Sequence, residues 1–164
     1  MPHVTLPWVL PLLLPFALIW QLSPLGIMPV FGWRIDPVLV LAMAGGLMLG
    51  PRYGLAFGLA AGACQDLLLG AGLLYGATKA LAGLAAGLIQ PHIYRLDALS
   101  LVLMGLVGTL VEGLMVASSL HAQGRTAVWD HFAALALPLG LAHALLLVAL
   151  YYWLLRFPMP EERE

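Results

Sequence analysis

Three charged side chains stand inside stretches of sequence that are otherwise apolar. Asp66 and Lys79 flank a Gly-Ala-Gly break in the stretch GACQDLLLGAGLLYGATK, and Glu112 lies in a later apolar stretch. Two carboxyl groups near one amine could act as an acid and base pair, carry protons or ions, or form an internal ion pair. A charge that faces lipid costs about 2.5–3.5 kcal/mol or more. We therefore expect these groups to face inward and to pair.

The composition indicates that the surrounding solvent is lipid. Of the 164 residues, 62% are hydrophobic and only 9% are charged, and the mean hydropathy is +0.97. A soluble domain has about one quarter charged residues, so this chain could not cover a globule with polar surface. The net charge of −1 and the absence of a basic tract argue against nucleic acid as a partner. The composition predicts a polytopic membrane protein.

Length and apolarity predict six transmembrane helices in one membrane domain that covers residues 1–164. The first has no cleavage signal after it, so we expect a retained helix that Pro11 and Pro15 kink or loosen. The loop that follows, residues 23–36, is predicted to lie at headgroup depth because it contains Phe31 and Trp33. The predicted spans are approximately 6–22, 37–49, 53–69, 73–89, 98–120 and 132–155.

The basic residues outside these spans predict the orientation. Six spans place both termini on the same side of the membrane. The side of the termini has four arginines and the other side has two, which favours cytoplasmic termini by the positive-inside rule. The four are Arg52, Arg95, Arg156 and Arg163, and the two are Arg34 and Arg125.

Glycines recur at helical spacing in the three central spans, which indicates close packing of these helices. Residues three or four apart lie near one helix face. Glycine on that face lets helix backbones approach closely in lipid. The predicted helix-packing glycines are Gly54, Gly58, Gly62 and Gly70 in the third span, Gly76, Gly83 and Gly87 in the fourth, and Gly105 and Gly108 in the fifth.

The three charged residues extend these glycine faces, and each lies in the same half of the membrane. We therefore predict an intramembrane polar network of Asp66, Lys79 and Glu112. Two acids against one base leave a surplus negative charge, so either one acid is protonated or another donor contributes. An internal clamp, a contact for a partner or ligand, and a proton or ion path all remain open. The expected hydrogen-bond partners are Gln65, Thr78, Thr109 and His143.

The sequence contains no motif that would complete an active site. There is no GxSxG elbow, no HExxH pair and no phosphate-binding Gly-rich loop. The five histidines, at positions 3, 92, 121, 131 and 143, do not have the spacing of metal ligands, and Cys64 is the only cysteine. We therefore expect a non-enzymatic protein with no catalytic residue, no metal and no cofactor.

The stretch GLAAGACQDLLLGAGLLYGATKALAGLAAGLI resembles the rod shape-determining protein MreD family. The upstream stretch RIDPVLVLAMAGGLMLGPRYGLAFG is similar to the entry of that family, in which an Asp-Pro or Pro-Asp step opens an apolar helix. The resemblance covers residues 34–115. It implies that Asp66 is the acidic position of the family motif, with Gly62 and Gly70 beside it, and that Lys79 and Glu112 are compatible polar positions.

The resemblance also implies a role and a set of partners. MreD-like proteins are non-enzymatic members of the bacterial cell-elongation machinery in the inner membrane. They work with MreC, which links to the peptidoglycan synthase RodA and its transpeptidase, and MreB filaments lie on the cytoplasmic side. The family is similar in fold to the substrate-binding components of energy-coupling-factor transporters, which implies an all-α six-helix bundle.

Two other functions fit the residues less well. A vitamin-type binding subunit of a transporter would explain the inward polar cluster, but the proline-broken first span lacks the AxxxA-type stripe for docking a coupling subunit. An intramembrane enzyme would have to use Asp66 and Glu112 with no nucleophile or metal beside them.

Overall fold

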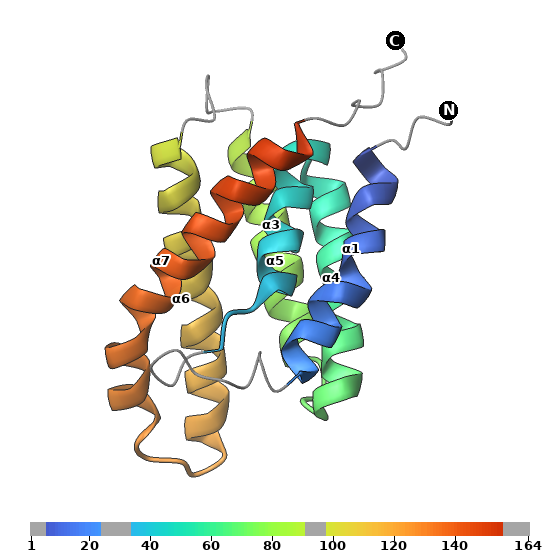
Figure 1. Ribbon diagram of the computed structural model, residues 1–164. Helices are drawn as coiled ribbons and strands as arrows, with labels where there is room; N and C mark the ends of the chain where they lie inside the picture. The colour runs from blue at the N-terminus through green and yellow to red at the C-terminus, as the bar shows by residue number, and fades with distance from the viewer. Residues whose placement is uncertain (1–5, 24–33, 91–97, 156–164) are drawn as a thin grey trace.

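The computed structural model describes residues 6–23, 34–90 and 98–155, and over these ranges the chain forms six helices and no strand. They are labelled as in Figure 1. Their bounds are α1 (Leu6–Leu22), α3 (Pro37–Leu49), α4 (Pro51–Leu69), α5 (Leu74–Ile89), α6 (Ala98–Ala122) and α7 (Val128–Leu154).

These helices coincide closely with the predicted ranges. The largest difference is at α7, which begins at Val128 rather than at position 132. Pro11 and Pro15 lie inside a continuous α1, although both were expected to kink or loosen it. Most of the predicted headgroup loop, including Phe31 and Trp33, lies outside the described residues.

The six helices run alternately up and down the bundle (Figure 1). α1 begins and α7 ends at one end, and the turns between α4 and α5 and between α6 and α7 lie at the opposite end. This arrangement brings the carboxyl end of α4 and the amino end of α5 together. α5 in turn packs against α6, and α3 packs against both α6 and α7.

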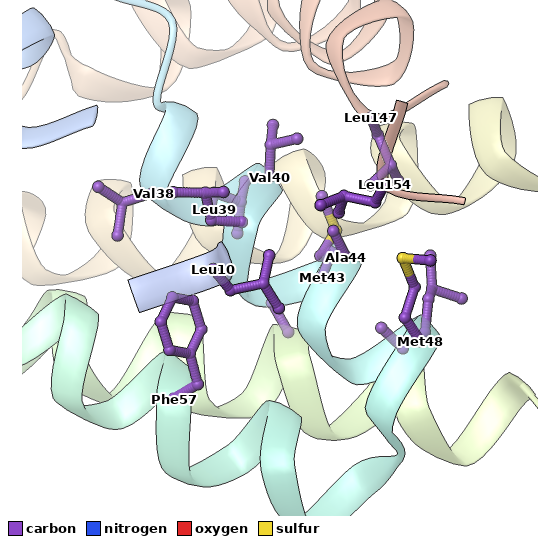
Figure 2. Packing of buried hydrophobic residues seen from close by; sticks show 14 of the residues in the cluster. Leu10, Val38, Leu39, Val40, Met43, Ala44, Met48, Phe57, Leu147 and Leu154 are labelled. Carbon is purple, nitrogen blue, oxygen red and sulfur yellow. The ribbon is translucent and has the colours of Figure 1, made fainter. Parts of the chain in front are cut away.

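The central element is α3, which is apolar on every side. Every residue from Val38 to Met48 is buried, and α3 contacts α1, α4, α5, α6 and α7. Figure 2 shows its side chains between Leu10 of α1, Phe57 of α4 and Leu147 of α7. A helix that is hydrophobic all round has to be covered on all sides. The other helices therefore form a shell around α3.

The outside of this shell is also apolar. Large side chains such as Trp8, Phe16 and Leu145 are more than 60% exposed. By length and composition, α6 and α7 are the described helices able to cross a membrane. α1, α3 and α5 are apolar but have only 17, 13 and 16 residues, fewer than the approximately 20 that span the hydrocarbon core. The structure thus supports two of the six predicted spans by these criteria.

Glycines join α4 directly to the backbone of α5. A Cβ atom added at Gly54, Gly58 or Gly62 would overlap backbone atoms of α5, and one added at Gly83 would overlap the backbone of Gly54. A Cβ atom added at Gly87 would likewise overlap Pro51, and one added at Gly105 would overlap Ala144 of α7. The helices therefore approach as closely as their main chains allow.

The other predicted glycines have different surroundings. A Cβ added at Gly108 would overlap the side chain of Met43, and one added at Gly76 would lie 3.2 Å from Asp66 Oδ2. Gly70 ends α4 in the left-handed conformation, with a φ of 67°. This conformation favours glycine and lets the chain reverse into α5.

The close approach of α4 and α5 predicts that Gly58→Ala lowers the free energy of unfolding by about 1–3 kcal/mol, because backbone cannot move aside as a side chain can. Gly45→Ala is the matched control, since its added Cβ would meet only side-chain atoms of Leu10 and Tyr53, the nearest at 3.3 Å. Thermal unfolding of the detergent-solubilised proteins measures both. Equal losses in the two variants would contradict backbone contact at Gly58.

Candidate functional site: a buried polar network around Asp36

The polar network is centred on Asp36, which precedes α3. Its Oδ1 atom accepts hydrogen bonds from the backbone N–H groups of Val38 (2.9 Å) and Leu39 (3.2 Å), and Pro37 occupies the first helical position. Asp36 is thus the N-cap of α3, and its negative charge interacts favourably with the helix dipole. Its side chain is only 13% exposed.

Side chains from three surrounding helices donate hydrogen bonds to the Asp36 carboxylate. Gln21 of α1 donates to Oδ1 at 2.6 Å, and Gln65 of α4 donates to Oδ2 at 3.0 Å. The Nζ atom of Lys79 in α5 lies 2.5 Å from the same Oδ2 atom. This single carboxylate therefore connects α1, α3, α4 and α5.

Lys79 carries the network on to α6. Its side chain is fully buried, and Nζ also forms an ion pair and hydrogen bond with Glu112 Oε1. The Nζ atom lies 4.6 Å from the ring centroid of Tyr75, in a cation–π contact. Lys79 therefore contacts Glu112, as predicted. The second acid that it contacts is Asp36, whereas Asp66 had been predicted.

His143 connects α7 to the same point. The backbone N–H of Asp36 donates to His143 Nε2 at 2.7 Å, so this nitrogen is unprotonated. His143 Nδ1 lies 2.9 Å from Thr109 Oγ1, and the Thr109 hydroxyl donates to the Gly105 carbonyl at 2.7 Å. The proton of the neutral imidazole must then be on Nδ1. His143 is consequently neutral and adds no second positive charge to the network.

Asp66 has a different role from the one predicted. Its carboxylate accepts hydrogen bonds from the backbone N–H groups of Tyr75 (2.9 Å) and Gly76 (2.7 Å). These groups lie in the first turn of α5, whose N-cap residue, Leu73, has no side-chain hydrogen bond. Asp66 holds α4 and α5 together by capping the start of α5 across the Gly70–Gly72 turn. The predicted Asp66–Lys79 pair is replaced by this contact.

The remaining predicted partners divide between the network and local contacts. Gln65 belongs to the network through its bond to Asp36. Thr78 does not, because its hydroxyl donates within α5 to the Tyr75 carbonyl at 3.1 Å. Sequence reasoning missed Asp36 and placed it at the membrane interface. The Asp-Pro step directly before an apolar helix was the signal for its capping role.

A cavity of about 210 Å³, largely apolar but lined in part by polar side chains, adjoins the network on the side of the α4–α5 turn. Asp36, Gln65, Glu112 and His143 line it together with Arg34. Within the described part of the chain, no group of three or more His, Cys, Asp or Glu residues could hold a metal ion. The arrangement can hold helices together by charge and can present hydrogen-bonding groups to a small molecule.

The geometry predicts that Lys79→Met lowers the free energy of unfolding by about 3–5 kcal/mol, because the carboxylates of Asp36 and Glu112 lose the cation that pairs with both. Adding Asp36→Asn and Glu112→Gln to Lys79→Met should restore part of this loss. Asp130→Asn, at an exposed acid of α7, is the control and should change stability little. Thermal or denaturant unfolding in detergent measures all variants, and a Lys79→Met protein as stable as the control would contradict the network.

Comparison with known proteins gives a family for the chain. No curated protein and no solved structure matches it at a significant level. One family model matches residues 5–156, and its description is "5TMR of 5TMR-LYT", a family of five-transmembrane regions. This match agrees with an all-helical membrane protein and does not by itself place the chain among the MreD proteins. Since the match covers nearly the whole chain, the protein belongs to the 5TMR of 5TMR-LYT family.

Proposed function

We propose that this chain is a non-enzymatic scaffold of the bacterial cell-elongation machinery that binds MreC in the inner membrane. The observation that carries the proposal is that the polar residues of the MreD-like stretch are engaged in holding helices together. Asp66 caps α5, and Lys79 joins Asp36 to Glu112. Through MreC, the scaffold would contact RodA and its transpeptidase, and MreB only indirectly. The termini are cytoplasmic in this proposal.

The groove between α5 and α6 is the place where we propose that the MreC transmembrane helix packs. An apolar cavity of about 500 Å³ lies there. Small residues interrupt its mostly large apolar lining, which also includes Met43 of α3. They include Ala82, Ala85, Ala86 and Gly108. Small residues allow a partner backbone to approach closely, which is what drives helix association in lipid.

A second apolar groove is better suited to contact with lipid than with a partner helix. This cavity, of about 680 Å³, lies between α1, α3 and α7. Bulky side chains such as Phe16, Trp20 and Leu145 line it, and they keep a second helix backbone at a distance. Ala149 is an exposed small residue in this groove, and it offers a matched comparison with Ala85.

The proposal predicts that Ala85→Trp reduces the amount of MreC that co-purifies with the tagged protein by roughly tenfold, because about 1.4 kcal/mol of lost packing corresponds to that factor. Ala149→Trp is the matched control, since it makes the same change at an exposed alanine of the other groove. Co-purification is measured by quantitative mass spectrometry after gentle solubilisation from native membranes.

Two further outcomes of this experiment would show whether the assigned groove or the proposed function is wrong. Loss of MreC with Ala149→Trp and not with Ala85→Trp would assign the partner to the other groove. Recovery of transporter coupling subunits and no MreC with the unsubstituted protein would contradict the scaffold, and would support the transporter alternative.

A further inference from the structure

We propose that the cavity beside Asp36 binds a small zwitterion of amino-acid size, with its ammonium group at the buried end and its carboxylate at Arg34. This inference goes beyond the scaffold function and does not depend on the partner. It rests on three features: an unpartnered acceptor on a residue that lines the cavity, an excess of carboxyl groups over cations at the buried end, and a cation at the rim.

The unpartnered acceptor is the amide oxygen of Gln65. This residue is only 3% exposed, and its Nε2 atom is held by Asp36 Oδ2 at 3.0 Å. Its Oε1 atom is the buried side-chain polar atom that lacks a hydrogen-bond partner among the described residues. A buried polar group without a partner costs about 1–3 kcal/mol. A ligand that brings an N–H donor to this oxygen would remove that cost.

The charges around the buried end favour a cationic donor. Asp36 and Glu112 both line the cavity, and both pair with the single ammonium group of Lys79. His143 is neutral by its hydrogen bonds, as shown above, so it adds no positive charge. Two carboxyl groups therefore share one lysine, and the buried end has one acid more than it has cations. An ammonium group could pair with this second acid and also donate to Gln65 Oε1.

The rim of the cavity is basic, in contrast to its buried end. Arg34 lines the same cavity and is exposed, and none of the carboxylates in ranges 6–23, 34–90 and 98–155 forms an ion pair with it. A guanidinium group binds a carboxylate in a bidentate manner. The volume of about 210 Å³ lies below the range of roughly 300–1,000 Å³ for drug-sized ligands. An acidic buried end, a basic rim and this small size together fit a zwitterion such as an amino acid.

Three matched probes test this assignment on the full-length, detergent-solubilised protein. L-Alanine carries both charges, ethylammonium lacks the carboxylate, and propionate lacks the ammonium group. We expect L-alanine to raise the midpoint of thermal unfolding and to give a binding isotherm in calorimetry. Ethylammonium and propionate should bind at least tenfold more weakly, because each loses one charged hydrogen-bonding group.

Substitutions at both ends of the cavity locate the binding. Arg34→Gln and Gln65→Leu should each weaken L-alanine binding roughly tenfold or more. Gln123→Leu and Arg125→Gln make the same changes at exposed positions of the α6–α7 turn and should leave it unchanged. Because Arg34 is exposed, its substitution tests the proposal even if Gln65→Leu destabilises the fold.

Three results would overturn the proposal. The first is the absence of any effect of L-alanine, which would leave a water molecule as the partner of Gln65. The second is binding of ethylammonium as tight as that of L-alanine, which would show that no carboxylate is recognised. The third is unchanged L-alanine binding by Arg34→Gln, which would place the ligand elsewhere.

Discussion

The structure depends on keeping the charge of Asp36 inside an apolar bundle. An isolated buried carboxylate is too costly to persist, so it must be hydrogen-bonded and paired. Its two oxygens accept hydrogen bonds from Gln21, Gln65, Lys79 and the first turn of α3. Its backbone N–H donates a hydrogen bond to His143. With Glu112 joined through Lys79, each of the six described helices contributes at least one residue to this network.

This requirement gives the bundle a specificity that apolar packing alone does not provide. Lipid is as apolar as the partner helices, so a leucine face does not distinguish one neighbour from another. Asp36 fixes where α3 begins, and Asp66 fixes where α5 begins. The glycine contacts of α4 with α5 then become possible, because the two helices are held in one register. The polar residues set the arrangement, and the small residues allow its close packing.

Local patterns predicted the helices well, because apolar runs bounded by glycine and proline determine where a helix begins and ends. The sequence also placed Lys79 and Glu112 in the same half of the membrane, which allowed their contact to be anticipated. The role of Asp36 was not predictable in this way, since Asp36 and Lys79 are 43 positions apart and meet only through the packing of α3 among its neighbours. Asp66 was predicted to pair with Lys79 because both flank the Gly70–Gly72 turn and lie in the same half of the membrane. Two N–H groups at the start of α5 are instead its partners.

Asp36 holds all six described helices together and not only the start of α3. Hydrogen–deuterium exchange of the Asp36→Ala protein in detergent, beside Asp130→Asn as control, tests it most directly. We expect faster exchange in the five helices other than α3, with the control unchanged. The affected positions should lie around Gln21, Gln65, Lys79, Glu112 and His143. Faster exchange confined to the first turn of α3 would contradict it and reduce Asp36 to a helix cap.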